Sequence, residues 1–366
     1  MANMLDYINN FGKERLTSTP FSDVDNLILS DLAYVRYEDA KRLLPASLES
    51  IYEAHAYACP EMRESLLKSA AESQRLKDAV LTEYESILSE QYTLQFSAVT
   101  FLLPDGTAYV AYRGTDNTLV GWKEDFNLSF ITPIPAQTEA LKYLSRIGRI
   151  LKCPLRVGGH SKGGNLAVYA SALCASDIQD RIINVYNNDG PGHDISTIAS
   201  DGYKRIAPRI RTFIPRSSIV GMLLEHTNDY LIVESDAHGL FQHHPYSWLI
   251  EDQSFIITQK HSDFSYCMNE SIRRWLTGMS PEKRRRMIDM IYNLLNKTNV
   301  KTIKELKSSA RNLIPIIIAA ADLSFEDKKE IIALTGQFMK IALDQYSSFV
   351  WESAVNNSVF SGRDKN

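Results

Sequence analysis

The sequence predicts an α/β fold with a mostly parallel central sheet flanked by helices, followed by a helical C-terminal extension. Two observations support this prediction. Short apolar segments typical of buried strands alternate with helical segments up to about residue 257, the order produced when helices join parallel strands. From residue 258 onward the pattern is helical to the end. We therefore expect residues 1–257 to form one domain and residues 258–366 to form a helical extension packed on or beside it.

The elements of this fold are predicted in chain order. Helices are expected over residues 20–36, 60–76, 138–151 and 165–173. Strands are expected over residues 92–103, 108–113, 155–157, 182–186, 210–214 and 230–233. Pro104, Asp105 and Gly106 form a turn that joins the first two strands into a hairpin. Two C-terminal helices begin at Ser280 and Ser324, because serine caps helix N-termini.

Composition and charge are those of an ordinary globular protein. The chain has 366 residues, of which 44% are hydrophobic and 23% are charged, and its formal net charge is −4. This charge does not favour nucleic acid, so no nucleic-acid partner is predicted. The N-terminus lacks the pattern of a secretory signal, and the most apolar window, residues 313–321, is too short for a transmembrane segment. We expect a cytoplasmic protein, although leaderless export is compatible with the sequence.

No metal site or cofactor is predicted. The four cysteines (Cys59, Cys153, Cys174 and Cys267) are dispersed and lack metal-ligand spacing, so we expect buried free thiols in a reducing compartment. The glycine-rich run around Ser161 is not a phosphate-binding loop, because that motif ends in Gly-Lys followed by Ser or Thr.

One short run predicts a nucleophile. Gly159, His160, Ser161, Lys162 and Gly163 form a Gly-x-Ser-x-Gly motif between an apolar strand and an apolar helix. This is the context of the nucleophile elbow in an α/β-hydrolase, in which the turn is too tight for a Cβ on either side. We therefore predict that Ser161 attacks an ester-like carbonyl carbon.

A serine nucleophile needs a histidine to take its proton. In this fold the base follows the serine in the chain. His243 is the preferred base, because its loop follows the last clear strand and precedes an aromatic segment, and His244 is the close competitor. The other histidines after Ser161 fit less well; they are His193, His226, His238 and His261.

The histidine in turn needs a carboxylate, and its position is less clear. The usual loop, residues 214–220, contains Ser217 and Ser218 but no acid. Asp189 follows the preceding strand, at a carboxyl end where such sheets place functional groups, and is therefore the predicted acid. The alternative is that Asp189 only shapes the Gly-Pro turn after it. Asp229 and Asp236 are further candidates.

The developing oxyanion needs two donors. One is predicted to be the backbone N–H of Lys162, which follows the nucleophile. The second is predicted in the loop at Gly114 and Thr115, where the glycine permits the bend. Trp122 and Asp125 follow this loop and are expected to brace it.

Together these residues carry a family resemblance over about residues 5–255. The run from Ala111 to Thr115 with Trp122 and Asp125, followed by the elbow, resembles the fungal-type (class 3) lipases. The closer resemblance is to a bacterial lipase-like family of unknown function, and it includes residues 188–192, residues 218–223 and the segment from Gln242 to Trp248. The resemblance implies an α/β-hydrolase fold, a Ser–Asp–His triad and ester hydrolysis without a metal. Lys162 and the serine pair at 217–218 depart from the lipase pattern.

The predicted function is hydrolysis of a carboxylic ester, with a small-molecule ester or a lipid as substrate. A thioesterase or a phospholipase would use the same triad, and the sequence does not separate them. A degenerate, non-catalytic hydrolase that acts as a binding or scaffold protein is the remaining alternative. The sequence leaves the oligomeric state open.

Overall fold

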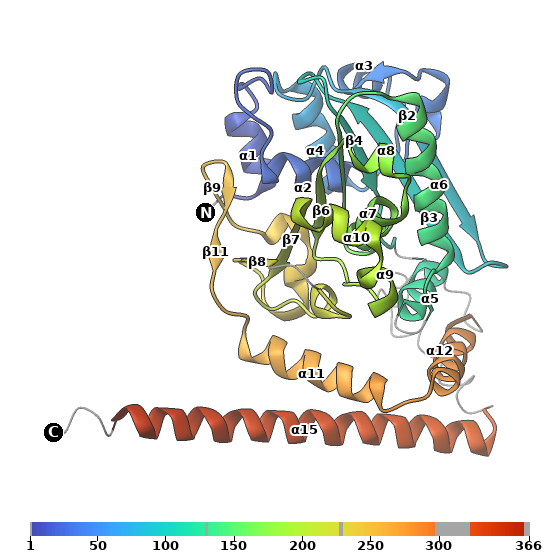
Figure 1. Cartoon of the computed structure of the whole chain (residues 1–366), viewed down its shortest axis with the longest axis vertical. Helices are drawn as coiled ribbons and strands as arrows, with labels where there is room; N and C mark the ends of the chain where they lie inside the picture. Colours follow the sequence, from blue (N-terminus) through green and yellow to red (C-terminus); the bar gives the residue numbers. More distant parts are fainter. Residues whose placement is uncertain (1, 117, 129–130, 227–229, 297–322, 362–366) are drawn as a thin grey trace. The chain divides into compact units, whose positions relative to one another are not determined.

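A nine-stranded sheet organises the N-terminal part of the chain (Figure 1). The structure is a computed structural model that describes residues 2–116, 118–128, 131–226, 230–296 and 323–361, and the strand count refers to these residues. The strand order is β1-β2-β3-β4-β5-β6-β7-β8-β11. The strands are β1 (Ala46–Ser47), β2 (Val80–Ser89), β3 (Leu94–Leu102), β4 (Ala108–Tyr112), β5 (Leu155–His160), β6 (Ile182–Asn188), β7 (Ile210–Pro215), β8 (Tyr230–Val233) and β11 (Ile257–Thr258), and a separate pair is formed by β9 (Ile250–Glu251) and β10 (Ser254–Phe255).

The centre of this sheet is parallel. Strands β4 to β8 pair in parallel, whereas β1 to β4 on one side and β8 with β11 on the other pair antiparallel. The predicted α/β class, with a parallel central sheet flanked by helices, is therefore confirmed. The strands β1, β2 and β11 extend the sheet beyond the predicted set.

Helices cover both faces of the sheet and create two cores (Figure 1). The first core contains side chains from α1 (Met4–Phe11), α2 (Asp23–Leu32) and α4 (Glu61–Glu72), and the second contains side chains from α6 (Pro135–Ile150), α7 (Lys162–Leu173) and α10 (Asp201–Ile206). Strand β4 contributes side chains to both cores, because successive side chains of a strand point to opposite faces of the sheet. Tyr109 and Ala111 belong to the first core, and Val110 and Tyr112 to the second.

The predicted helices and strands correspond to elements of the structure. The helices at 20–36, 60–76, 138–151 and 165–173 are α2, α4, α6 and α7, and the six predicted strands are β3 to β8. The remaining elements of this part are short: α3 (Leu48–Glu53), α5 (Leu119–Asn127), α8 (Ser176–Gln179), α9 (Ile195–Ala199) and the 3-10 helices η1 (Asp39–Arg42), η2 (Ala207–Arg209), η3 (Val220–Met222), η4 (Gly239–His243) and η5 (Pro245–Ser247). The apolar window at 313–321 lies outside the described residues.

The chain divides into two compact units. One comprises Met1–Asp116 with Val120–Lys260, and the other comprises Asn117–Leu119 with His261–Asn366. The domain boundary expected after residue 257 stays a prediction.

The second unit is helical and contains α11 (Asp263–Thr277), α12 (Pro281–Asn296) and α15 (Phe325–Ser361). Trp275 of α11 donates a hydrogen bond of 3.0 Å to the Leu334 carbonyl oxygen of α15, and its ring packs edge-on against Phe338. Helices α12 and α15 begin where the serine caps predicted. No helix in the described ranges has both the length and the apolar character needed to cross a bilayer.

The cysteines are only partly as expected. All four are free, and Cys174 is buried, but Cys59, Cys153 and Cys267 are partly exposed. The expectation of uniformly buried thiols was therefore wrong.

Candidate active site

The predicted site residues gather at the carboxyl ends of the parallel strands. Thr115 follows β4, Ser161 follows β5 and Asp189 follows β6. His243 ends η4, which follows β8. Because the strands are parallel neighbours, these loops share one edge of the sheet. This is the edge at which open parallel sheets bind their ligands.

Ser161 lies in a strained turn between β5 and α7. Its backbone has φ 59° and ψ −133°, a combination that residues with a Cβ rarely adopt. Its N–H donates to the Asn188 carbonyl oxygen at 2.9 Å, and its own carbonyl oxygen accepts from the N–H of Gly164 at 2.9 Å. A Cβ on Gly163 would lie 2.1 Å from the Tyr112 carbonyl oxygen, so the motif needs glycine there. The strand, turn and helix required of a nucleophile elbow are thus all present.

Asp189 and His243 are in direct contact. Nδ1 of His243 lies 2.6 Å from Oδ2 of Asp189. The Asp189 side chain is fully buried, whereas the His243 side chain is 29% exposed. A carboxylate can only accept, so Nδ1 carries the proton and Nε2 is left as a base.

The loop after β7 holds Asp189 in place. Ser218 donates its hydroxyl to Oδ1 of Asp189 at 2.5 Å, and the Gly221 N–H donates to the same oxygen at 3.1 Å. A Cβ on Gly221 would lie 2.2 Å from this oxygen. The loop after β7 contains serines where an acid is usual. One of them, Ser218, is a direct hydrogen-bond partner of Asp189, which follows β6.

His160 connects the elbow to the loop that carries His243. Nε2 of His160 lies 2.8 Å from the His243 carbonyl oxygen, and Nδ1 lies 3.2 Å from the Tyr34 hydroxyl. Burial, with a smaller contribution from His243, lowers the pKa of His160 well below its ordinary value, so the ring is neutral. A carbonyl only accepts, so Nε2 donates to it and Nδ1 accepts from Tyr34. His160 thus fixes the backbone of the residue that contacts Asp189.

The loop at Gly114 and Thr115 lies against the nucleophile. A Cβ on Gly114 would lie 3.1 Å from the Ser161 Cβ. The Thr115 hydroxyl donates to both carboxylate oxygens of Asp125, at 2.5 and 2.6 Å. Within the described residues, the backbone N–H groups of Thr115 and Lys162 have no hydrogen-bond partner. These two groups are therefore available to an oxygen bound beside Ser161.

Charged side chains are buried behind this loop. The Lys162 side chain is 1% exposed, and its Nζ lies 2.7 Å from Oε2 of the fully buried Glu124 and 3.9 Å from Oδ1 of Asp125. Burial raises the pKa of Asp125 to about 6, an effect that Lys162 and the Thr115 hydroxyl oppose. Asp125 contacts Thr115 of the loop that it is expected to brace. Trp122, the other residue expected to brace this loop, exposes 42% of its surface and contacts the Phe126 ring.

The alternative bases lie in other environments. His244, the close competitor, is exposed, and its ring packs 5.2 Å from that of Tyr246. His226 contacts the Gly221 carbonyl oxygen through Nε2 at 2.6 Å. His193 is buried beside Asn165, and His238 is exposed.

The alternative acids do not approach His243 in the described structure. Asp236 is exposed, and its backbone N–H donates to the Ser247 carbonyl oxygen. Asp229 lies outside the described residues. Of the candidates that the structure describes, Asp189 alone hydrogen-bonds His243.

No role in the site was predicted from the sequence for several residues of this cluster: Tyr34, Gln95, Glu124, Ser218 and Gly221. Each acts through a contact between elements distant in the chain, which sequence spacing does not reveal. Gln95 offered one signal, because it is a long polar residue in a strand whose other side chains are apolar or small hydroxyls. The structure buries it fully.

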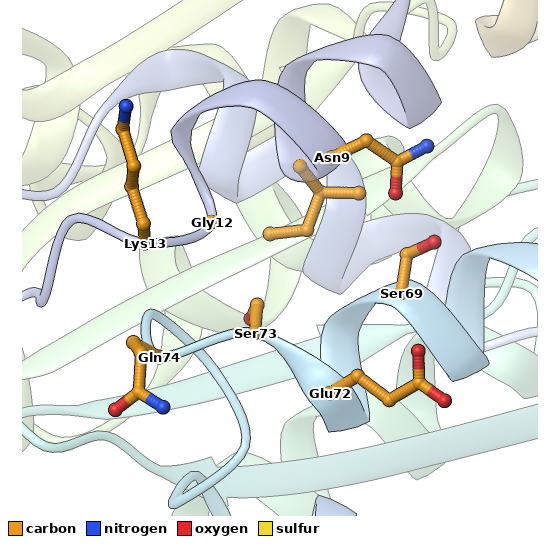
Figure 2. Close-up of a pocket in the computed structure, with 8 residues that line it drawn as sticks. Asn9, Gly12, Lys13, Ser69, Glu72, Ser73 and Gln74 are labelled. Carbon is orange, nitrogen blue, oxygen red and sulfur yellow. The ribbon is translucent and has the colours of Figure 1, made fainter.

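The described residues show no metal-like cluster. No group of three or more His, Cys, Asp or Glu side chains in these ranges is arranged to hold a metal ion. A separate hollow of about 250 Å³ lies between α1 and α4 (Figure 2). Its lining, which includes Asn9, Lys13, Glu72 and Gln74, shares no residue with the site around Ser161.

The parallel sheet, the elbow and the residues gathered beside it define the class of protein: the chain is a lipase-like α/β-hydrolase. Comparison with protein families then gives the particular group. The chain belongs to the Mbeg1-like family, whose model matches residues 70–293, more than half of its length. This match confirms the predicted resemblance to a lipase-like family. It spans the segment from Thr115 to His243 that carries the candidate site.

Two solved structures were also similar. M37 lipase is 17% identical, with 54% of this chain and 68% of that chain covered and a TM-score of 0.36. The native propeptide complex of the Rhizomucor miehei lipase is 17% identical, with 57% and 65% covered and a TM-score of 0.33. No curated protein matched this chain.

Proposed function

We propose that this chain is a serine hydrolase that cleaves carboxylic esters through an acyl-enzyme on Ser161. The observation that carries the proposal is the 2.6 Å contact between His243 and the buried Asp189 at the same sheet edge as the strained Ser161. A neutral imidazole with its Nδ1 proton on a carboxylate is a general base, and a serine in such a turn exposes its hydroxyl to substrate.

In the first step, Nε2 of His243 takes the proton of the Ser161 hydroxyl as Oγ attacks the ester carbonyl carbon. The carbonyl π electrons move to the oxygen, and the N–H groups of Thr115 and Lys162 donate to this oxyanion. The hydroxyl and the imidazole make no hydrogen bond in the structure. Contacts of this kind often tighten only when substrate is bound.

In the second step, the tetrahedral intermediate collapses and the bond to the leaving oxygen breaks. His243 gives its proton to that oxygen, so the alcohol leaves and the acyl group stays on Ser161. Water then attacks the acyl carbon as His243 takes one of its protons. The second collapse returns that proton to Ser161 and releases the acid. Asp189 stabilises the imidazolium in both half-reactions.

The test is covalent labelling with a fluorophosphonate, followed by intact mass and peptide mapping. We expect one adduct on Ser161 in the wild-type chain and none in Ser161→Ala. His243→Gln should slow labelling by at least about 1,000-fold, because the serine loses its base. Hydrolysis of p-nitrophenyl esters of increasing chain length should be lost in the same variants.

Two variants serve as matched controls. Ser65→Ala removes an exposed hydroxyl on α4, and His238→Gln removes an exposed imidazole that follows β8. Both should label and hydrolyse like the wild type. If folded wild-type protein takes up no probe, or takes it up equally in Ser161→Ala, the proposal is wrong and a non-catalytic hydrolase fold becomes the better account.

A further inference from the structure

The ammonium group of Lys162 is buried and fully hydrogen-bonded. Its three acceptors are Oε2 of Glu124 at 2.7 Å, Oε1 of Gln95 at 2.9 Å and the Gln95 carbonyl oxygen at 3.0 Å. An ammonium has three protons, so this set satisfies it completely. Burying two charges costs desolvation that their attraction often does not repay, and apolar residues of similar volume are often equally stable. Stability alone therefore gives little reason for Lys162 to be charged.

The ion pair connects the elements that surround the nucleophile. Glu124 of α5 also accepts from the Gln95 N–H of β3 at 3.2 Å and, through Oε1, from the Ala136 N–H of α6 at 2.9 Å. Gln95 donates in turn to the Gly114 carbonyl oxygen at 3.5 Å. Lys162 is the first residue of α7. One network of hydrogen bonds thus reaches the start of α7 and the loop after β4.

The backbone N–H groups of Lys162 and Thr115, which have no hydrogen-bond partner among the described residues, belong to segments held by this network. The first is that of Lys162 itself, whose side chain is locked on Glu124. The second is that of Thr115, which follows Gly114 and whose hydroxyl is bound by Asp125, the neighbour of Glu124 on α5. An oxyanion donor is effective only if its direction is fixed before the charge develops.

We propose that the Lys162 side chain is a positioning residue of the oxyanion site, because its ammonium, locked on Glu124 and Gln95, sets the distance and direction of the two backbone donors. The inference rests on the proposed function, since it assigns a role within the same reaction. Lys162 does not touch the substrate through its side chain. Its effect is transmitted through the backbone of the elbow and of the loop after β4.

The test compares a transition-state mimic with a ground-state mimic. A trifluoromethyl ketone adds the Ser161 hydroxyl and forms a hemiketal oxyanion, whereas the matching methyl ketone binds largely unreacted. In Lys162→Met, we expect the inhibition constant of the trifluoromethyl ketone to rise about 100-fold and kcat to fall by a similar factor, as for loss of an oxyanion donor. The methyl ketone constant and KM should change less than about threefold.

A double variant separates positioning from charge compensation. Lys162→Met leaves the Glu124 carboxylate buried without its cation, whereas Lys162→Met with Glu124→Gln removes both charges and keeps the volume. We expect the double variant to recover the unfolding midpoint but not the trifluoromethyl ketone affinity. Recovery of that affinity in the double variant would falsify the positioning role, because Lys162 would then only neutralise Glu124.

Further controls keep the outcomes distinct. Lys142→Met removes an exposed lysine of α6 and should change neither inhibition constant. If neither Lys162 variant folds, Gln95→Met leaves the ion pair and loosens the link to Gly114, and an unchanged trifluoromethyl ketone constant there would overturn the inference. A wild-type chain that binds no trifluoromethyl ketone and takes up no fluorophosphonate contradicts the proposed function instead.

Discussion

The two halves of the candidate site are held by different chemistry. On the acid–base side, the donors to the Asp189 carboxylate among the described residues, besides His243 itself, are the neutral Ser218 hydroxyl and Gly221 N–H. On the oxyanion side, charges of both signs are buried next to one another, with Lys162 on Glu124.

The difference follows from what each half must do. A carboxylate that stabilises an imidazolium must keep its charge available, and a buried cation in contact with it would compete with the histidine. Backbone N–H donors need fixed geometry and not added charge, so a closed ion pair can anchor them. The comparison predicts that disturbing the acid–base half changes the chemistry of proton transfer, whereas disturbing the oxyanion half changes geometry and local stability.

The largest effect in the acid–base half is expected from Asp189→Asn. The amide keeps the volume but stabilises the wrong imidazole tautomer, so kcat for ester hydrolysis should fall about 10,000-fold with little change in KM. Steady-state kinetics on the best p-nitrophenyl ester provides the measurement. Asp236→Asn is the matched control and should retain the wild-type rate. A near-wild-type rate in Asp189→Asn would move the acid role to another residue.

A smaller effect is expected from Ser218→Ala. This change removes one of the two neutral donors on Oδ1 of Asp189 and leaves the Gly221 N–H. A hydrogen bond to a charged group contributes about 1.5–3 kcal/mol, so kcat should fall by about tenfold to one-hundredfold. Ser217→Ala is the control, because the backbone N–H that binds Gln242 survives the change. Equal rates in the two variants would mean that the Ser218 hydroxyl does not support Asp189.

The fold was predictable from the sequence where local patterns decide it. Strand β8 was predicted with its observed bounds, and the strands and helices around Ser161 were all located. Strand β2 was missed because Glu83 and Glu85 interrupt its apolar residues. In the structure these side chains face Arg146 of α6, a contact between segments about sixty residues apart.

The site was predictable only in its outline. The Gly-x-Ser-x-Gly motif indicated Ser161 because the tight turn constrains the local sequence, and strand order then suggested Asp189 and His243. The partner of Asp189 in the next loop, Ser218, has no local signature, since an isolated serine is a common loop residue. The pairing of Lys162 with Glu124 is likewise a contact between separate elements, so only the three-dimensional structure reveals it.

The smallest expected effect concerns stability in the oxyanion half. Burial raises the pKa of Asp125 from its ordinary value of 3.8 to about 6. The folded chain therefore binds the Asp125 proton more tightly than the unfolded chain does. As the pH rises from 3.8 through about 6, ionisation of Asp125 lowers the free energy of unfolding. The full shift would correspond to about 3 kcal/mol, but the side chain is 32% exposed and solvent screens it. We expect ionised Asp125 to lower the free energy of unfolding by about 1–2 kcal/mol at pH 7.5.

Asp125→Asn should remove this cost while its amide oxygen still accepts from the Thr115 hydroxyl. The variant should therefore be more stable than the wild type at pH 7.5, and the advantage should shrink toward pH 4.5, where folded wild-type Asp125 is already protonated. Urea unfolding of both proteins at pH 4.5, 6 and 7.5 measures the difference directly, and the histidines common to both cancel. Asp39→Asn is the control, because it shows how removal of an exposed carboxylate changes the free energy of unfolding. A stability difference that does not vary with pH would mean that the fold does not disfavour the Asp125 carboxylate, and the contrast between the two halves would then rest on geometry alone.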